Sequence, residues 1–145
     1  YYTIKKANDE CQNALEKVVE PMLALASMKN RAQNRKFLQL AYKYLIQNHP
    51  HDSICGCSID QVHKDVEYRF DQTKEICDVL ALDYMINNTR PFLDPEGRET
   101  DGVLTLVNTL PFDREELITA RLNMRSDFAA KFSDQPLGFE FMNRF

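Results

Sequence analysis

The chain has 145 residues, of which 43% are hydrophobic and 28% are charged, a composition typical of a globular protein. This length suffices for one domain, or for a small domain and part of another. The formal net charge of -4 provides no basic surface for nucleic acid or an anionic membrane, so we expect neither as a partner. No apolar run approaches the ~20 residues that span a bilayer, and the first residues lack the apolar core and cleavage site of a signal peptide.

The first predicted helix covers about positions 8–27, where apolar residues recur at three- and four-residue steps. Pro21 lies inside this pattern and removes one backbone donor, so we expect it to kink the helix or to split it in two. The apolar stripe consists of Ala14, Leu15, Val18, Val19, Met22, Leu23 and Ala26.

The second predicted helix covers residues 34–47 and ends at "NHP", because the residue before a proline disfavours the helical conformation. Its stripe consists of Phe37, Leu38, Ala41, Tyr44 and Leu45.

The third predicted helix is the longest and covers residues 58–86. Ser58 is a suitable N-cap, although Asp52 or Ser53 could start an earlier turn. Its stripe consists of Ile59, Val62, Val66, Phe70, Thr73, Cys77, Leu80 and Tyr84. Three helices that each have one apolar face predict an antiparallel three-helix bundle over residues 1–90.

A different pattern follows the third helix. "TRPFLDPEGRETDG" concentrates proline, glycine and charge, which predicts a linker over residues 91–102. "VLTLVN" (103–108), "LITARLNM" (117–124) and "LGFEFMNRF" are typical of strands. Because so few strands make a poor independent fold, we expect residues 103–145 to be the beginning of a β-sandwich domain. The predicted fold class is therefore mainly α, a three-helix bundle followed by a few strands of a truncated β-sandwich.

The four cysteines are Cys11, Cys55, Cys57 and Cys77. A chain of this size with long apolar stripes does not need disulfides, and Cys55 and Cys57 are awkwardly spaced for a bridge between them. We therefore expect reduced cysteines and a cytoplasmic protein. Helical spacing places Cys77 in the third stripe, which predicts a small core residue.

The break between the second and third helices, "NHPHDSICGCSID", gathers side chains that bind metals. His49, His51, Cys55 and Cys57 could form a self-contained zinc site, but zinc sites usually place two to four residues between paired cysteines and use a second pair. His63 lies at the flank of the third stripe and is expected to be a surface or boundary residue.

His51 and Asp52 allow two interpretations. A loop between helices can hold an imidazole and a carboxylate toward one cleft, where they would serve as a metal ligand and a sugar contact. The same pair at a helix start can also be a cap and its neighbour. The residues alone leave both interpretations open.

"QNHPHDSICGCSIDQVHKDVEYRFDQ" resembles the middle-domain motif of glycoside hydrolase family 38, the zinc-dependent retaining α-mannosidases, in its bacterial branch. "IKKANDECQNALEKVVEPMLALAS" is similar to the first bundle helix of that domain, and "VLTLVNTLPFDREE" is similar to the first strands of the family's C-terminal β-domain. The resemblance covers about residues 1–125, and its specific part is "HPHDSICGCSIDQVH".

The resemblance implies that His51 is the zinc ligand supplied by the helical domain and that Asp52 hydrogen-bonds the hydroxyls of the bound mannose. Cys55, Gly56 and Cys57 would form the small-residue turn beside the site, and His49 has no metal role in the family pattern. The remaining zinc ligands, the aspartate nucleophile and the acid/base carboxylate would come from a preceding α/β barrel domain. The "HKD" at 63–65 lies on the third helix and is not that domain's zinc motif.

The expected function is thus a segment of a glycosidase that hydrolyses terminal α-mannosides by a zinc-assisted retaining mechanism with a covalent mannosyl-enzyme. Its partners would be a mannose-containing substrate and the barrel and β-domain of the same protein, and the segment alone would be inactive. A mannosylglycerate-type hydrolase of the same family is an alternative. A helical interaction module without chemistry and a small zinc-binding module also stay open.

Overall fold

The computed structural model describes residues 2–28, 34–89, 105–115 and 117. The chain divides into two units, and the first, Tyr1–Asp113, is described here by itself. In the second, only positions 114, 115 and 117 are among the described residues. The helical elements are α1 (Tyr2–Asn13), η1 (Ala14–Val19), α2 (Glu20–Met28), α3 (Arg35–Gln47), α4 (His51–Ile54) and α5 (Asp60–Thr89).

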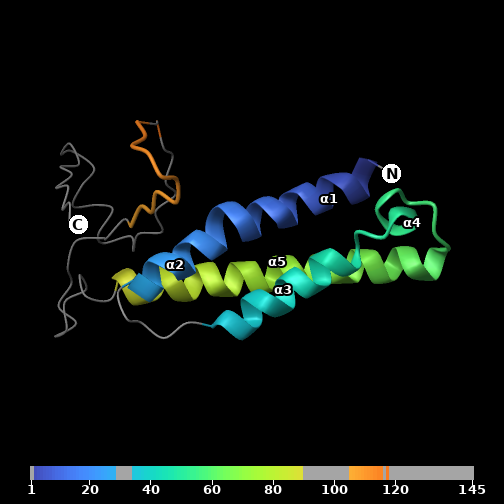
Figure 1. The fold of residues 1–145 in the computed structure, drawn as a ribbon, viewed down its shortest axis with the longest axis horizontal. Coiled ribbons are helices and arrows are strands. Elements are labelled where there is room, and N and C mark those ends of the chain that lie inside the picture. Colours follow the sequence, from blue (N-terminus) through green and yellow to red (C-terminus); the bar gives the residue numbers. More distant parts are fainter. Residues whose placement is uncertain (1, 29–33, 90–104, 116, 118–145) are drawn as a thin grey trace, which may run out of the picture. The chain divides into compact units, whose positions relative to one another are not determined.

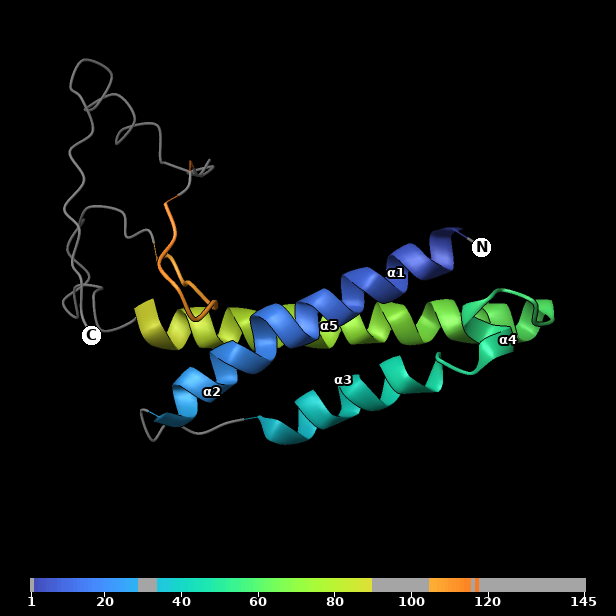
Figure 2. The ribbon, with the colours of Figure 1, turned by 45° about the horizontal axis from the view of Figure 1, so that its top comes forward.

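Three long helical segments pack side by side in an up-down-up arrangement (Figure 1). The elements α1, η1 and α2 follow one another without a break and form the first segment, α3 runs back along it, and α5 runs forward again. The predicted helical bundle is therefore confirmed. Both views place the short helix α4 at the end of the bundle where α1 begins (Figure 2).

The first segment begins at Tyr2, earlier than predicted, because Ile4 and Cys11 extend its buried stripe toward the N-terminus. It also continues through Pro21, where we expected a kink or a break. The turn before the proline widens into the π-helix η1, in which the Glu20 N–H donates to the Leu15 carbonyl five residues earlier. This widening shifts the buried face, so that Val19 is 1% exposed whereas its neighbour Val18 is 38% exposed.

The core contains apolar residues from all three segments. Its members are Ile4, Cys11, Leu15, Val19, Leu23, Ala41, Leu45, Val66, Phe70, Cys77 and Leu80. The prediction that Cys77 is a small core residue is confirmed. Two other stripe assignments are wrong: Phe37 lies in the first turn of α3 and Ile59 precedes α5, and both side chains are more than half exposed.

Ser58 does not cap the third helix as predicted. The helix α5 begins at Asp60, and the Ser58 hydroxyl is buried without a hydrogen-bond partner among the described residues. The earlier turn that we weighed near Asp52 does exist, as α4. Pro50 is the N-cap of that turn. The residues that follow α4 close its C-terminal end, so α5 begins only at Asp60.

The predicted strands are not confirmed. Positions 105–108 of the first one adopt no regular structure, although Val107 packs against a small cluster of Met22, Ala26 and Tyr84. The predicted linker at 91–102 and nearly all of the other two strands lie outside the described residues. The strands and the domain boundaries therefore stay predictions.

Candidate functional site

His51 and Asp52 are the first two residues of α4. The backbone of this helix begins at Pro50, whose carbonyl accepts hydrogen bonds from the N–H groups of Ser53 and Ile54 at 2.9 and 3.0 Å. No side chain caps the helix start, so the interpretation of His51 and Asp52 as a cap and its neighbour has no hydrogen bond to support it.

The other end of α4 closes in a Schellman motif. The Cys57 N–H donates to the Asp52 carbonyl at 2.9 Å, and the Gly56 N–H donates to the Ser53 carbonyl at 3.1 Å. Gly56 has a φ of 70°, in the left-handed region where a Cβ atom is unfavourable. This motif explains the small-residue turn, and it ties the backbone of Asp52 to the residues that follow.

The side chains of His51 and Asp52 are 91% and 67% exposed, and His51 Nε2 lies 3.0 Å from Asp52 Oδ1. A contact between two exposed groups is weak and readily exchanged for another partner. Both side chains are therefore accessible to a ligand. An imidazole and a carboxylate are donor types that zinc takes, so this pair fits part of a zinc site.

The other metal-capable residues of the break have different partners. His49 Nε2 lies 2.9 Å from Asn8 Oδ1 on α1, and the Cys57 thiol lies 3.8 Å from the Cys55 carbonyl. Across residues 2–28, 34–89 and 105–115, no group of three or more His, Cys, Asp or Glu residues is arranged to hold a metal ion. His63 is a boundary residue, as predicted, with Nε2 3.4 Å from Glu67 Oε1.

Asn48 and Arg69 belong to the surroundings of the site and were not found from the sequence. Asn48 is fully buried, its Nδ2 donates to the Val66 carbonyl at 3.0 Å, and its Oδ1 accepts from Arg69 Nη1 at 3.2 Å. In the sequence, Asn48 indicated a helix end. No local spacing pairs it with an arginine 21 positions later.

The four cysteines are all free, and they fall into two classes. Burial raises the pKa of Cys11 to about 11 and that of Cys77 to about 12. Both thiols therefore stay protonated at neutral pH and act as core residues. Cys55 and Cys57 are exposed beside α4.

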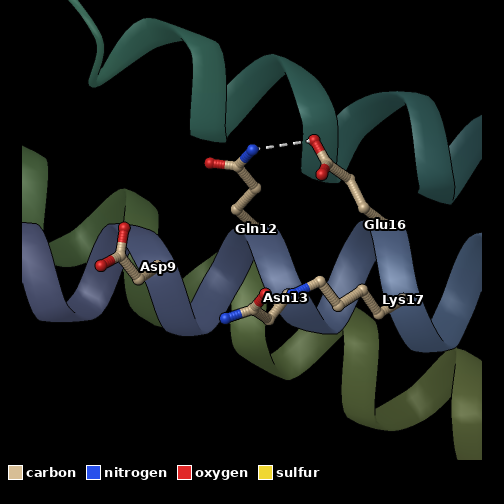
Figure 3. Close-up of a pocket in the computed structure, with 5 residues that line it drawn as sticks. All are labelled: Asp9, Gln12, Asn13, Glu16 and Lys17. Carbon is tan, nitrogen blue, oxygen red and sulfur yellow. Dashed lines mark hydrogen bonds between the residues drawn. The ribbon is translucent and has the colours of Figure 1, made fainter.

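A polar hollow lies along α1 and η1, apart from His51 and Asp52 (Figure 3). Its lining residues are Asp9, Gln12, Asn13, Glu16 and Lys17. All five come from one length of helix, and Gln12 Nε2 donates to Glu16 Oε1 at 3.1 Å. Side chains from a single helix do not enclose a substrate, so we assign the hollow no function.

The sequence of this chain matches a known protein family. Residues 2–85, which include the whole bundle core and α4, match the family model described as "Alpha mannosidase middle domain". The chain therefore belongs to glycoside hydrolase family 38, and these residues are its α-mannosidase middle domain.

A protein of Halalkalibacterium halodurans named "Putative mannosylglycerate hydrolase" is 38% identical over 115 residues. The match covers 79% of this chain but 11% of the relative, so the chain spans about a tenth of that protein's length. No solved structure matches the chain. No helix in the described ranges is long and apolar enough to cross a bilayer.

Proposed function

We propose that this chain supplies one zinc ligand, His51, and one substrate contact, Asp52, to a glycosidase that hydrolyses terminal α-mannosides with retention of configuration. The observation that carries the proposal is the accessible imidazole–carboxylate pair at the start of α4, within the residues that match the α-mannosidase middle domain. The match of residues 2–85 is what connects this pair to glycoside hydrolysis.

Each residue has a distinct role in this proposal. His51 donates a ring nitrogen to the metal, and Asp52 accepts hydrogen bonds from sugar hydroxyls, which fixes the orientation of the ring. When bound, zinc supplies a positive charge that attracts hydroxyl oxygens and helps to hold the sugar in place. The nucleophile, the acid/base carboxylate and the other ligands belong to a barrel domain of the same protein, so we expect this chain to be inactive by itself. A reducing, cytoplasmic location is part of this proposal, as the cysteine pattern of the sequence predicts.

Mannosylglycerate hydrolysis is the second candidate, because the relative from Halalkalibacterium halodurans bears that name. The same reaction type would then act on mannose joined to glycerate. Parallel assays of the full-length protein with a nitrophenyl α-mannoside and with mannosylglycerate separate the two candidates. The contacts of this chain with mannose would be the same in both.

The test uses the full-length protein and three variants. We expect His51→Ala to lose zinc and activity, since one ligand of the shared site is removed. We expect Asp52→Asn to keep zinc but to lower kcat/KM by roughly 10- to 100-fold, the effect of losing a charged hydrogen-bond acceptor. His63→Ala is the matched control, because this histidine lies on α5 outside the site, and it should behave as wild type.

The outcomes also separate the rival interpretations. Near-wild-type zinc content and activity in His51→Ala would rule out the proposed role and leave the helical interaction module. One zinc bound per molecule of the 145-residue chain alone, lost together with helicity on chelation, would instead indicate a self-contained zinc module.

A further inference from the structure

The exposed side chains of His51 and Asp52 are not held in place by packing of their own. The helix that carries them, α4, has four residues, too few for a helix to be stable by itself. Their positions must therefore be fixed through the backbone on either side. The Schellman motif fixes the backbone after α4. The backbone before α4 must therefore be fixed by residues 48–50.

Asn48 is the buried member of this connection. It is 0% exposed, and both ends of its amide are bonded to α5, through the Val66 carbonyl and the Arg69 guanidinium. Its backbone N–H also donates to Leu45 at the end of α3. A buried amide with all of these partners has one favourable orientation, because every alternative leaves a buried polar group unpaired.

The two residues after Asn48 extend this constraint to α4. The ring of His49 contacts Asn8 on α1, so consecutive residues are attached to two different helices. Pro50 follows with its φ fixed by the pyrrolidine ring, and its carbonyl starts α4. Between the buried amide and His51 there is thus little rotational freedom.

We propose that Asn48 and Arg69 are positioning residues that place His51 and Asp52 in the glycosidase site. The role of the two exposed residues rests on the proposed function, whereas the attachment of the turn to α5 does not. Arg69 acts through Asn48: its Nη1 donates to the amide oxygen, and the amide nitrogen is thereby directed to the Val66 carbonyl. Loss of the guanidinium frees the amide to rotate and loosens the turn.

The test compares Arg69→Ala with Thr73→Val in the full-length protein. Arg69 is half-buried, so its truncation disturbs the core less than replacement of Asn48 would. Thr73 is the matched control: its buried hydroxyl donates to the Arg69 carbonyl at 2.8 Å and lies 3.5 Å from the Ala41 carbonyl of α3, but it contacts neither the Arg69 guanidinium nor the Asn48 amide in the described structure. Two properties are measured: the zinc dissociation constant by chelator competition, and hydrogen exchange of the peptide 51–57 by mass spectrometry.

We expect Arg69→Ala to weaken zinc binding by about 10- to 100-fold, the usual effect of losing a residue that orients a metal ligand. Exchange of the amides in 53–57 should become faster, because these groups donate to carbonyls of the same turn. Thr73→Val should change neither property. Arg69→Lys should recover part of both, since a lysine ammonium can still donate to Asn48 but lacks the rigid fork.

Wild-type zinc affinity and exchange in Arg69→Ala would overturn the inference, and so would equal changes in Thr73→Val. The proposed function is tested separately, by His51→Ala: if that variant keeps its zinc, the proposed function fails, whatever the result for Arg69→Ala. Exchange is measured on the zinc-free protein, so that it does not depend on zinc occupancy, and it decides by itself whether Arg69 fixes the turn.

Discussion

Asn48 and Thr73 are the buried polar residues of the described core, and both lie where α3 and α5 meet. Asn48, the C-cap of α3, donates to the Val66 carbonyl of α5. The Thr73 hydroxyl of α5 donates to the Arg69 carbonyl of its own helix at 2.8 Å and lies 3.5 Å from the Ala41 carbonyl of α3. The two contacts are seven positions apart on each helix, in opposite chain directions. A slip of either helix by one turn would leave the Asn48 amide without its Val66 partner, so we infer that Asn48 fixes the antiparallel register of α3 and α5.

A surface ion pair joins α1 and α5, and it predicts that the stability of the bundle depends on pH. Lys74 Nζ donates to Glu10 Oε2 at 2.8 Å, and this hydrogen bond lowers the pKa of Glu10 below 4.5 and raises that of Lys74 above 10.5. The stabilisation from Glu10 is present above its unfolded pKa and is lost as the pH falls through the lowered value. The contribution of Lys74 is present below its unfolded pKa and is lost as the pH rises through the raised value.

We therefore expect Glu10→Gln to lose less stability than wild type as the pH falls below about 5. The reason is that the variant has no carboxylate to protonate at this position. The measurement is the urea midpoint of the 145-residue chain as a function of pH. Asp78→Asn removes another exposed carboxylate of the bundle but leaves the pair intact, and it serves as a control for the lost charge. An acid-side slope as steep in Glu10→Gln as in wild type would show that the pair does not contribute.

At the scale of single residues, the resemblance to the family supplied His51 and Asp52, and the structure shows both to be accessible. The sequence could not supply Asn48 and Arg69. Their contact joins two helices, and no helical period or motif connects positions so far apart. Residues that touch a ligand belong to short motifs, whereas residues that position them depend on tertiary packing.

The short element α4 depends on one glycine. Gly56 adopts the left-handed conformation that closes the Schellman motif, and the Asp52 carbonyl is one of the acceptors in it. We expect Gly56→Ala to lower the free energy of unfolding by roughly 1–2 kcal/mol, because a Cβ atom is unfavourable at this φ. Urea titration of the 145-residue chain measures the change.

Gly56→Asn is the control for this prediction, since asparagine tolerates the left-handed region better than alanine does. It should retain more of the stability. Equal effects of the two substitutions would indicate that loss of glycine flexibility, or a steric clash nearby, determines the stability instead of the backbone conformation.

Among the elements, the long helices could be predicted, whereas the starts of the first segment and of α5 could not. The stripes of α3 and α5 have a regular period, and α3 begins within one residue of the prediction. The start of α5 was wrong because Ser58 has the chemistry of an N-cap but lies in the connection that follows the Schellman motif. The widened turn before Pro21 was also missed, because the period shows where apolar residues recur and not how the backbone closes each turn.

On the scale of the whole bundle, one face of α5 contributes to the core and the other faces solvent. Leu80 is 2% exposed in the core, whereas Leu82 on the same helix is 60% exposed. We expect Leu80→Ala to lower the free energy of unfolding by about 2–5 kcal/mol, through lost burial and the cavity that remains. Leu82→Ala should change it by less than about 0.5 kcal/mol, as surface substitutions usually do. Urea denaturation of the 145-residue chain measures both, and similar values for the two variants would contradict the burial seen here.

The architecture of the bundle followed from three amphipathic patterns and the short connections between them. The sequence shows less clearly how much of each apolar face a neighbouring helix covers. Phe37 and Ile59 have the hydrophobicity of core residues but lie at the ends of helices, where the neighbouring segment no longer covers them. Periodicity gives the face of a helix, and the length of its neighbours decides how much of that face is buried.

The π-helix η1 has a consequence for sequence comparison. A turn closed by a hydrogen bond to the fifth residue back contains one residue more than an α-helical turn. Deletion of one residue from Ala14–Val19 would therefore let the same helix continue as a regular α-helix, with the buried positions before and after it unchanged. A family member whose first helix is α-helical throughout should be one residue shorter here. Its alignment with this chain should place a one-residue gap in the middle of a helix, where gaps are normally assigned to loops.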